Sequence, residues 1–284
     1  MAIIDILTVD SQIALATKTG VERLNRQTDE QEFRKIIEWI SPSDHAAQHC
    51  DFLARREQGT GKWLLESEKF KNWRDTPGSH LYCPGIPGSG KTILTSIVID
   101  SLLSKFKKDA TVGIAYVYCN FRRKQEQGAK ELLSAMLRQL VQGMSSIPDP
   151  IVQVYKQSSA KSVQPELSEI SRLLHSTILL YSRTFFLVDA LDECEGSGQF
   201  RNTFIAELKK IQTNAMTNLY LTSRFIPEIE KEFKECHVIE IRANEEDLQR
   251  YLVGHMGQLP SFVGRNPSLQ EEIKKAILQT TQGM

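Results

Sequence analysis

The chemistry that is easiest to interpret in this sequence lies in one run of eight residues, Gly85-Ile86-Pro87-Gly88-Ser89-Gly90-Lys91-Thr92. The run fits the phosphate-binding pattern G-x-x-x-x-G-K-[ST] at every fixed position. Glycines allow the tight turn that points consecutive N–H groups at phosphate oxygens, and the helix that follows adds its positive end. In such a loop the lysine contacts the β- and γ-phosphates, and the threonine hydroxyl ligates Mg²⁺. The predicted nucleotide-binding residues are Gly85, Pro87, Gly88, Ser89, Gly90, Lys91 and Thr92.

A strongly apolar strand leads into a group of acids. Residues 185–188 are Phe-Phe-Leu-Val, a run typical of a strand buried on both faces of a parallel sheet, and Asp189 follows. Open α/β sheets bind ligands at the carboxyl ends of such strands. We predict that Asp189 helps to hold Mg²⁺ and that Asp192 or Glu193 orients the attacking water. The spacing does not decide between these two acids, and ordinary capping acids would give the same local pattern.

A third polar group follows another strand. Residues 218–221, Asn-Leu-Tyr-Leu, are predicted to be extended, and Thr222, Ser223 and Arg224 come directly after them. Parallel strands end at one edge, so we expect Arg224 to point toward the γ-phosphate, whose charge a guanidinium recognises. An arginine after a strand is more often a solvated charge. The functional interpretation therefore depends on the other two motifs, because all three would share that edge.

Strands and helices alternate around these motifs. The patterns predict strands at 79–83, 112–119, 185–188, 218–221 and 238–241, and helices at 93–106, 129–141, 150–157, 166–181, 200–211, 244–256 and 268–280. This alternation indicates an α/β fold with a doubly wound, mainly parallel sheet and helices on both faces. A helical pattern that starts at Asp29 precedes it, followed by two more helices whose predicted N-caps are Ser43 and Thr60. We expect a helical lead-in over 1–75, a P-loop core over 76–242 and the start of a C-terminal helical subdomain over 243–284.

Composition narrows the class of partner. Lysine plus arginine equals aspartate plus glutamate at 35 each, so bulk charge favours neither nucleic acid nor an anionic membrane as the main partner. Five cysteines form no C-x-x-C pair, which favours reduced thiols and a cytoplasmic protein. No apolar run reaches the length of a membrane span. His45 and His49 lack an H-E-x-x-H frame, so we expect solvated or capping side chains there and no metal site.

Together these motifs resemble the NACHT family of signal-transduction NTPases, in particular the nephrocystin-3-like N-terminal NTPase segment of fungal NACHT proteins of the heterokaryon-incompatibility and ankyrin-repeat type. The resemblance covers roughly residues 30–255. It rests on five segments: Glu38–Pro42, Gly59–Leu65, Cys83–Gly88, Val188–Cys194 and Thr222–Arg224. The family usually carries glycine at the position of Ala190, which is a minor departure.

The resemblance implies a five-stranded parallel sheet of the STAND branch and slow Mg²⁺-dependent hydrolysis of ATP or GTP. It also implies a switch that is closed with diphosphate and forms a homo-oligomer with triphosphate, and a base site near Arg56 and Thr60. The family's winged-helix segment and C-terminal repeats are not recognisable before Met284, which predicts a fragment or a short relative. Two alternatives stay open: a non-catalytic P-loop interaction module, and a P-loop ATPase or kinase with fast turnover.

Overall fold

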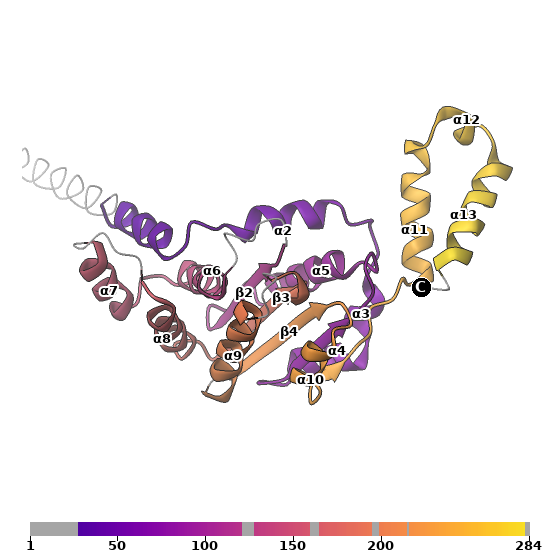
Figure 1. Ribbon diagram of the computed structural model, residues 1–284. Helices are drawn as coiled ribbons and strands as arrows, with labels where there is room; N and C mark the ends of the chain where they lie inside the picture. The colour runs from indigo at the N-terminus through magenta and orange to yellow at the C-terminus, as the bar shows by residue number, and fades with distance from the viewer. Residues whose placement is uncertain (1–27, 121–127, 160–164, 195–198, 215, 282–284) are drawn as a thin grey trace, which may run out of the picture.

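A five-stranded sheet forms the centre of the protein, as Figure 1 shows. The structure, a computed structural model, describes residues 28–120, 128–159, 165–194, 199–214 and 216–281. Every strand pair is parallel, and the order across the sheet is β2-β3-β4-β1-β5. The strands are β1 (His80–Pro84), β2 (Val112–Tyr118), β3 (Arg183–Asp189), β4 (Thr217–Ser223) and β5 (His237–Val238). The predicted doubly wound α/β fold is confirmed.

Helices connect the strands. A helix over residues 28–40 precedes α2 (His45–Ala54), α3 (Lys62–Glu66) and α4 (Glu68–Asp75), while residues 1–27 of the predicted lead-in lie outside the described residues. Within the sheet region lie α5 (Lys91–Lys105), α6 (Ala129–Gln142), α7 (Asp149–Ser159), α8 (Leu167–Ile178), the 3₁₀ helix η2 (Leu191–Glu193), α9 (Gln199–Asn214) and α10 (Pro227–Glu232). Then come α11 (Glu245–His255), η3 (Met256–Gln258), α12 (Ser261–Gly264) and α13 (Pro267–Thr281), which Figure 1 shows set apart from the sheet. None of the helices in the described ranges has both the length and the apolar character that a membrane span requires.

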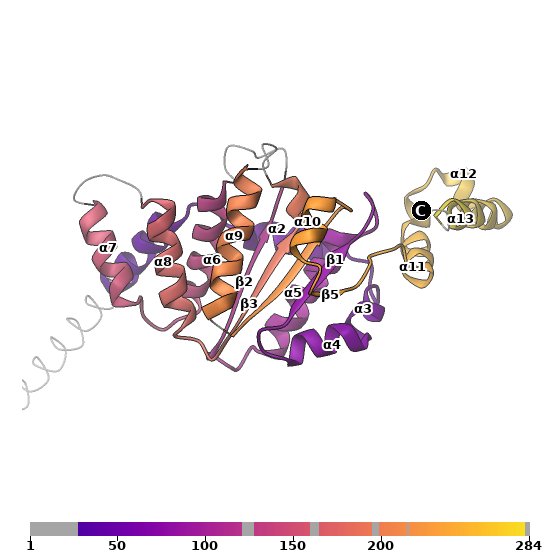
Figure 2. The ribbon, with the colours of Figure 1, turned by 60° about the horizontal axis from the view of Figure 1, so that its bottom comes forward.

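Both faces of the sheet are covered, as the apolar strand sequences predict. In β3, Phe186 and Val188 pack in one core with residues of α6, α8 and α9, whereas Phe185 and Leu187 pack in a second core with residues of α3, α4 and α5. Figure 2 shows these two helix layers on either side of the strands. Successive side chains of a strand point to opposite faces, so β1, β2, β3 and β4 each contribute to both cores.

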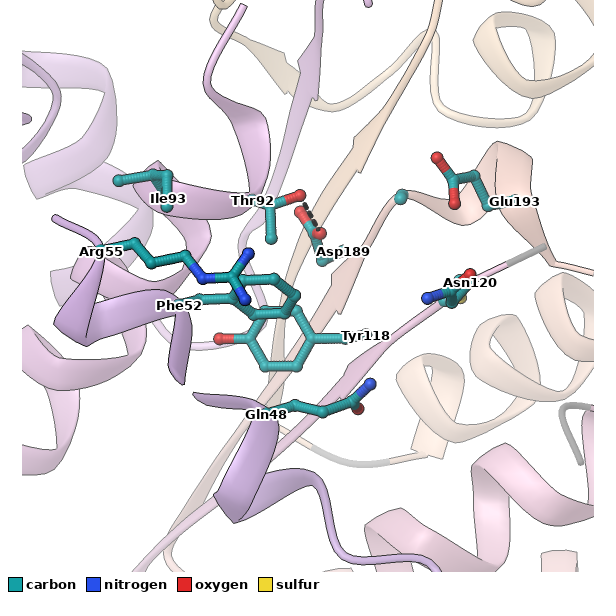
Figure 3. Close-up of a pocket in the computed structure, with 11 residues that line it drawn as sticks. Gln48, Phe52, Arg55, Thr92, Ile93, Tyr118, Asn120, Asp189 and Glu193 are labelled. Atoms are coloured by element: carbon teal, nitrogen blue, oxygen red, sulfur yellow. Dashed lines mark hydrogen bonds between the residues drawn. The ribbon is translucent and has the colours of Figure 1, made fainter. Parts of the chain in front are cut away.

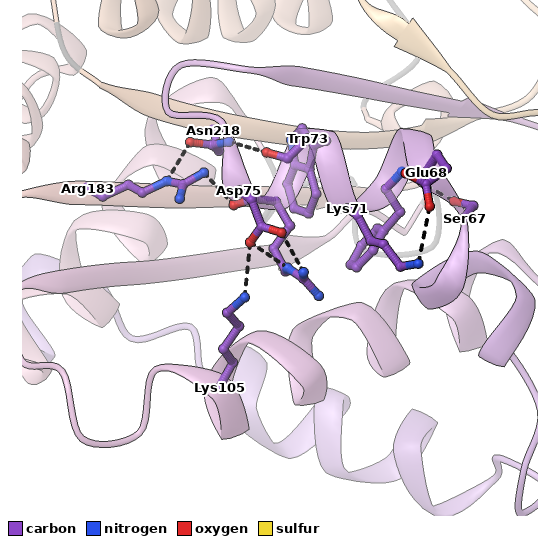
Figure 4. Close-up of polar contacts among 10 residues, drawn as sticks. Ser67, Glu68, Lys71, Trp73, Asp75, Lys105, Arg183 and Asn218 are labelled. Carbon is purple, nitrogen blue, oxygen red and sulfur yellow. Dashed lines mark hydrogen bonds and ion pairs between the residues drawn. The ribbon is translucent and has the colours of Figure 1, made fainter.

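A buried asparagine attaches α4 to the amino-terminal end of the strands (Figure 4). Asn218 Nδ2 donates to the carbonyl oxygens of Trp73 at 2.6 Å and Thr76 at 2.8 Å, and Oδ1 accepts from Arg183 Nε at 3.0 Å. Trp73 Nε1 donates to the Leu219 carbonyl oxygen at 2.9 Å. Leaving any of these buried groups unpaired would cost about 1–3 kcal/mol, so the network specifies where α4 packs. α4 lies just before the predicted core boundary at residue 75 and packs against the sheet.

The last strand is shorter than predicted. The sequence pattern predicts a strand over 238–241, but β5 spans only His237–Val238. Beyond it, Ile239 N still donates to the Tyr82 carbonyl oxygen at 3.1 Å, and Ile241 N donates to Pro84 at 2.7 Å. The segment after β5 therefore continues beside β1, with every second backbone N–H bonded to a β1 carbonyl oxygen, and it ends beside the loop that follows β1.

Two helix starts differ by one residue from the prediction. Asp44, not Ser43, is the N-cap of α2, and its side chain accepts from Ala46 N at 2.8 Å. Gly61, not Thr60, is the N-cap of α3, because its backbone adopts a φ of 77° that glycine tolerates best. The Thr60 hydroxyl instead donates to the Glu57 carbonyl oxygen at 2.8 Å.

The expectation of solvated histidines on α2 is wrong. His45 and His49 are each 6% exposed, because this face of α2 packs on β2. His49 Nδ1 lies 3.0 Å from the Tyr118 hydroxyl. Spacing of four residues correctly puts both side chains on one helical face, but that face is turned toward the sheet.

Candidate functional site

The phosphate-loop pattern folds as a turn between β1 and α5. Gly88 (φ 78°) and Gly90 (φ 89°) have a left-handed backbone conformation that glycine adopts without steric cost. Gly85 is needed for space instead, since a Cβ there would lie 2.5 Å from the Ile241 carbonyl oxygen. The turn puts Lys91 and Thr92 in the first turn of α5, where backbone N–H groups lack partners within the helix. Such a helix start favours anions.

Lys91 points back into this loop. Its Nζ donates to the carbonyl oxygens of Gly85 and Ile86, both at 2.7 Å. Partial burial lowers the pKa of Lys91, while the carboxylates of Asp192 and Asp189 act in the opposite direction. The ammonium group therefore lies among the loop carbonyls and within the field of the acids from β3.

Strand order brings the three motifs to one edge. β4 lies between β1 and β3, and the register pairs Cys83 with Thr222 and Leu221 with Val188. The loop itself joins this edge, since Gly85 N donates to the Ser223 carbonyl oxygen at 3.0 Å. All three strands thus end together, as predicted for parallel neighbours.

Asp189, at the end of β3, lies in a cage of three threonine hydroxyls. Thr92 Oγ1 donates to Asp189 Oδ2 at 2.7 Å, and the hydroxyls of Thr95 and Thr222 donate to Oδ1 at 2.8 Å each. The carboxylate is 2% exposed; burial raises its pKa, and the three hydroxyls oppose that rise. Thr95 is an addition to the predicted site. It follows Thr92 by three residues, and this i, i+3 spacing on α5 is the signal that indicates it.

The residues at this edge fit a magnesium nucleotide. A threonine hydroxyl beside a carboxylate offers the hard oxygen ligands that Mg²⁺ prefers. A Cβ added at Gly88 or Gly90 would meet nothing within 4 Å, so the loop is open on that side. Within the described part of the chain, the buried Ser89 hydroxyl has no hydrogen-bond partner. An open loop with an unsatisfied hydroxyl is suited to an oxygen-rich anion.

Arg224 and Asp192 form a two-point contact. The Arg224 backbone N donates to Asp192 Oδ1 at 2.9 Å, and its Nε donates to Oδ2. The Asp192 side chain is 2% exposed, whereas that of Arg224 is 51% exposed. Asp192 raises the pKa of Arg224, which keeps the guanidinium charged. The buried Asp192 carboxylate therefore positions the Arg224 side chain.

Glu193 lies in a different place from its neighbour. It lines a cavity of about 240 Å³ together with Thr92 and Asp189, shown in Figure 3. The opposite wall comes from α2 and the end of β2, through Gln48, Phe52 and Tyr118. Asn120, just after β2, also lines this cavity. The sequence motifs indicated none of these wall residues, because α2 and β2 approach the site only through tertiary packing.

A second cavity, of about 380 Å³, lies on the other side of the loop. Thr60 and Trp63 line it from the α3 side, and the segment 242–251 closes it from the α11 side. Its apolar walls include Ile93, Leu94, Ile97 and Tyr251. Of the two residues expected near a nucleotide base, Thr60 is in this lining. Arg56 is not: its Nη2 donates to the Thr60 carbonyl oxygen at 3.3 Å.

Comparison with solved structures finds matches of low identity. The Orc1 protein of Aeropyrum pernix in complex with DNA is 13% identical, with 70% of this chain and 48% of that chain covered and a TM-score of 0.46. Cdc6p from Pyrobaculum aerophilum is 15% identical, with coverages of 76% and 52% and a TM-score of 0.45. A Walker-type ATPase of Pyrococcus abyssi is 12% identical, with coverages of 78% and 64% and a TM-score of 0.47. The chain thus spans about half the length of the first two structures.

The sequence comparisons are more specific. No curated protein matches the chain. The family model described as "Nephrocystin 3, N-terminal" matches residues 59–224, which is more than half of the chain. The matched range begins at Gly59 and ends at Arg224, so it contains the loop, the acids after β3 and the arginine after β4. The chain belongs to the nephrocystin 3, N-terminal family.

Proposed function

We propose that this chain is a nucleotide-binding signalling switch of the NACHT/STAND type, which binds Mg-ATP or Mg-GTP and hydrolyses it slowly. The observation that carries the proposal is the 2.7 Å hydrogen bond between the hydroxyl of Thr92 and the buried carboxylate of Asp189. It joins the phosphate loop to the acid of β3 across an intervening strand, which is the pair of oxygen ligands a nucleotide-bound magnesium ion needs.

Each residue at the edge has a distinct role in this proposal. Loop N–H groups and the start of α5 bind the phosphates, and Lys91 exchanges its two carbonyl partners for phosphate oxygens, which form stronger, charge-assisted bonds. Thr92 and Asp189 hold the ion. A magnesium ion held by these two residues would supply positive charge that offsets the charge of the phosphate oxygens. Arg224, held by Asp192, faces the terminal phosphate and stabilises its developing charge.

Glu193 is our choice for the acid that orients water. It lines the same cavity as Thr92 and Asp189, whereas Asp192 is occupied on both oxygens by Arg224. A general base must lie within reach of the proton that it takes. Glu193 meets that condition, because it lines the cavity beside Thr92 and Asp189, the two proposed ligands of the ion. We therefore place the catalytic function in Asp192, Glu193 and Arg224, with Asp192 acting through the arginine.

Contacts between α11 and the second cavity support a conformational role. Asp247 Oδ2 accepts from Gly61 N at 2.8 Å and from Trp63 Nε1 at 3.1 Å, and Arg250 Nη1 donates to the Gly59 carbonyl oxygen. A base that enters this cavity would touch both sides of these contacts, so its binding can shift α11 against the sheet. We propose that this shift controls homo-oligomer formation in the triphosphate state.

The proposal includes the domain organisation of the chain and its cellular setting. We propose a helical lead-in over 1–75, an NTPase core over 76–242 and the start of a C-terminal helical subdomain over 243–284. Unpaired cysteines support a cytoplasmic setting.

Release of bound nucleotide tests this proposal first. The purified chain is denatured, and the supernatant is separated by chromatography to identify the base and the number of phosphates. Titration with Mg-ATP and Mg-GTP follows, with Lys91→Ala as the variant and Lys105→Ala, at the far end of the same helix, as the matched control. Unchanged nucleotide affinity in the Lys91 variant would refute the site.

A turnover assay separates the remaining alternatives. Slow turnover together with nucleotide-dependent assembly supports the switch. Rapid turnover without a change in assembly would favour an ATPase or kinase, and binding without turnover would favour an interaction module.

A further inference from the structure

Two buried thiols meet beside the candidate site. Cys119 Sγ and Cys194 Sγ lie 2.6 Å apart, although the two residues are 75 positions apart in the sequence. Cys119 follows β2 and is 5% exposed; Cys194 is the C-cap of η2 and is 3% exposed. The backbone supports the same juxtaposition, because Cys119 N donates to the Asp189 carbonyl oxygen at 3.0 Å.

The pair differs from the other cysteines in its surroundings. Cys50 is on α2, Cys83 is buried in β1, and Cys236 lies between α10 and β5. Cys119 also lines the cavity that contains Asp189 and Glu193, so a small solute that enters there comes next to this residue. Cys194 comes directly after Glu193, and a bond to it would restrain that acid.

We propose that Cys119 and Cys194 are a redox modification site, at which a peroxide joins the two thiols in a disulfide between the end of β2 and the acid segment. The Cys119 sulfur attacks one oxygen of hydrogen peroxide, so that an S–O bond forms, the O–O bond breaks and one water leaves. The Cys194 sulfur then attacks the oxidised sulfur, the S–S bond forms, the S–O bond breaks, and a second water leaves. The two thiol protons end in the two waters, and peroxide is the species reduced.

The bridge has two consequences. It closes a loop of 76 residues in the unfolded chain, which favours the folded state. It also restrains Glu193 relative to Asp189, and this second consequence rests on the proposed function. Contact with Cys194 and burial raise the pKa of Cys119, so oxidation requires prolonged exposure to excess peroxide.

Thiol mapping on the unaltered chain tests the proposal. The protein is incubated with hydrogen peroxide, unfolded, alkylated and digested without reductant. We expect two of the five thiols to be lost, and a cross-linked peptide pair to contain Cys119 and Cys194 with the mass of two hydrogen atoms missing. The melting temperature should rise by roughly 5 °C after oxidation and should return to its original value when dithiothreitol is added. Five alkylated thiols, or oxidation confined to Cys50, Cys83 or Cys236, would overturn it.

Variants separate this inference from the proposed function. Cys194→Ala should lose the oxidation-dependent rise in melting temperature, and Cys50→Ala should keep it. In the reduced chain we expect turnover, and roughly a tenfold loss of it after oxidation. If the disulfide forms but the reduced chain shows no turnover, the proposed function fails and the modification site stands. If the reduced chain shows turnover but no disulfide forms, the modification site fails and the proposed function stands.

Discussion

Asp192 accepts hydrogen bonds from both the backbone N–H and the side-chain Nε–H of Arg224, so one buried carboxylate determines where the arginine lies. Removal of either partner should have the same effect on turnover. We expect Asp192→Asn and Arg224→Ala each to slow hydrolysis by about 10- to 100-fold, and the double variant to be no slower than Arg224→Ala, because the two act as a unit. Single-turnover hydrolysis measures this.

Nucleotide affinity should stay within about threefold of the parent in both single variants, because neither residue belongs to the phosphate loop. Glu193→Gln is the comparison: it should also keep affinity but lose about 100-fold or more in rate, as expected for a residue that orients water. Additive losses in the Asp192 and Arg224 double variant would contradict the coupling.

Thr92 tests the magnesium site. Thr92→Val keeps the shape of the side chain and removes the hydroxyl that donates to Asp189. We expect it to weaken Mg-nucleotide binding by about 10- to 100-fold, while Thr92→Ser stays close to the parent. Calorimetric titration with Mg²⁺, and again with a chelator, measures the difference. Equal losses with and without the ion would show that the hydroxyl does not serve the metal.

One buried histidine, His49, and one half-buried histidine, His80, predict a loss of stability in acid. Burial lowers the pKa of His49 and of His80 from the ordinary value of 6.5. Below about pH 6.5 the unfolded chain therefore takes up protons that the folded chain resists, so stability is present above that pH and is lost as the pH falls. Thermal unfolding between pH 7.5 and pH 5.5 (roughly one unit on either side of 6.5) should show this. His49→Gln should flatten the profile.

Asn218 should be a stability determinant far from the candidate site. Its side chain is fully buried and pairs with two carbonyls of the α4 segment and with Arg183. Asn218→Ala should destabilise the protein by about 3 kcal/mol in urea unfolding, because several buried groups lose partners together. Asn72→Ala, at an exposed position of α4, is the control and should change stability by less than about 0.5 kcal/mol.

Ala190 has a backbone conformation that suits glycine. Its φ of 53° is the only positive value at a non-glycine position in the described ranges. Ala190→Gly should stabilise the protein by about 1 kcal/mol, since the left-handed conformation is costly for alanine. Ala135→Gly, in the middle of α6, should destabilise it by about that amount instead. A loss of stability in the Ala190 variant would show that its methyl group contributes more through packing.

Local patterns were sufficient for the elements that carry the motifs. The unbroken apolar run before Asp189 is typical of a strand covered on both sides, and β3 is such a strand. The ends of elements were less predictable. Gly61, not Thr60, is the N-cap of α3, and its N–H donates to Asp247, 186 positions later, a partner that no local pattern contains.

The chain's own order of residues therefore specified the phosphate loop, the acids after β3 and the alternation of strands and helices, because these follow from backbone freedom and from apolar periods within a few residues. The different surroundings of Asp192 and Glu193 arose only in the folded protein. Adjacent in sequence, they point to different partners: one to Arg224 at the end of β4, the other into a cavity walled by α2 and β2. Contacts of this kind depend on strand order and helix packing, which bring together residues that no short stretch of sequence relates.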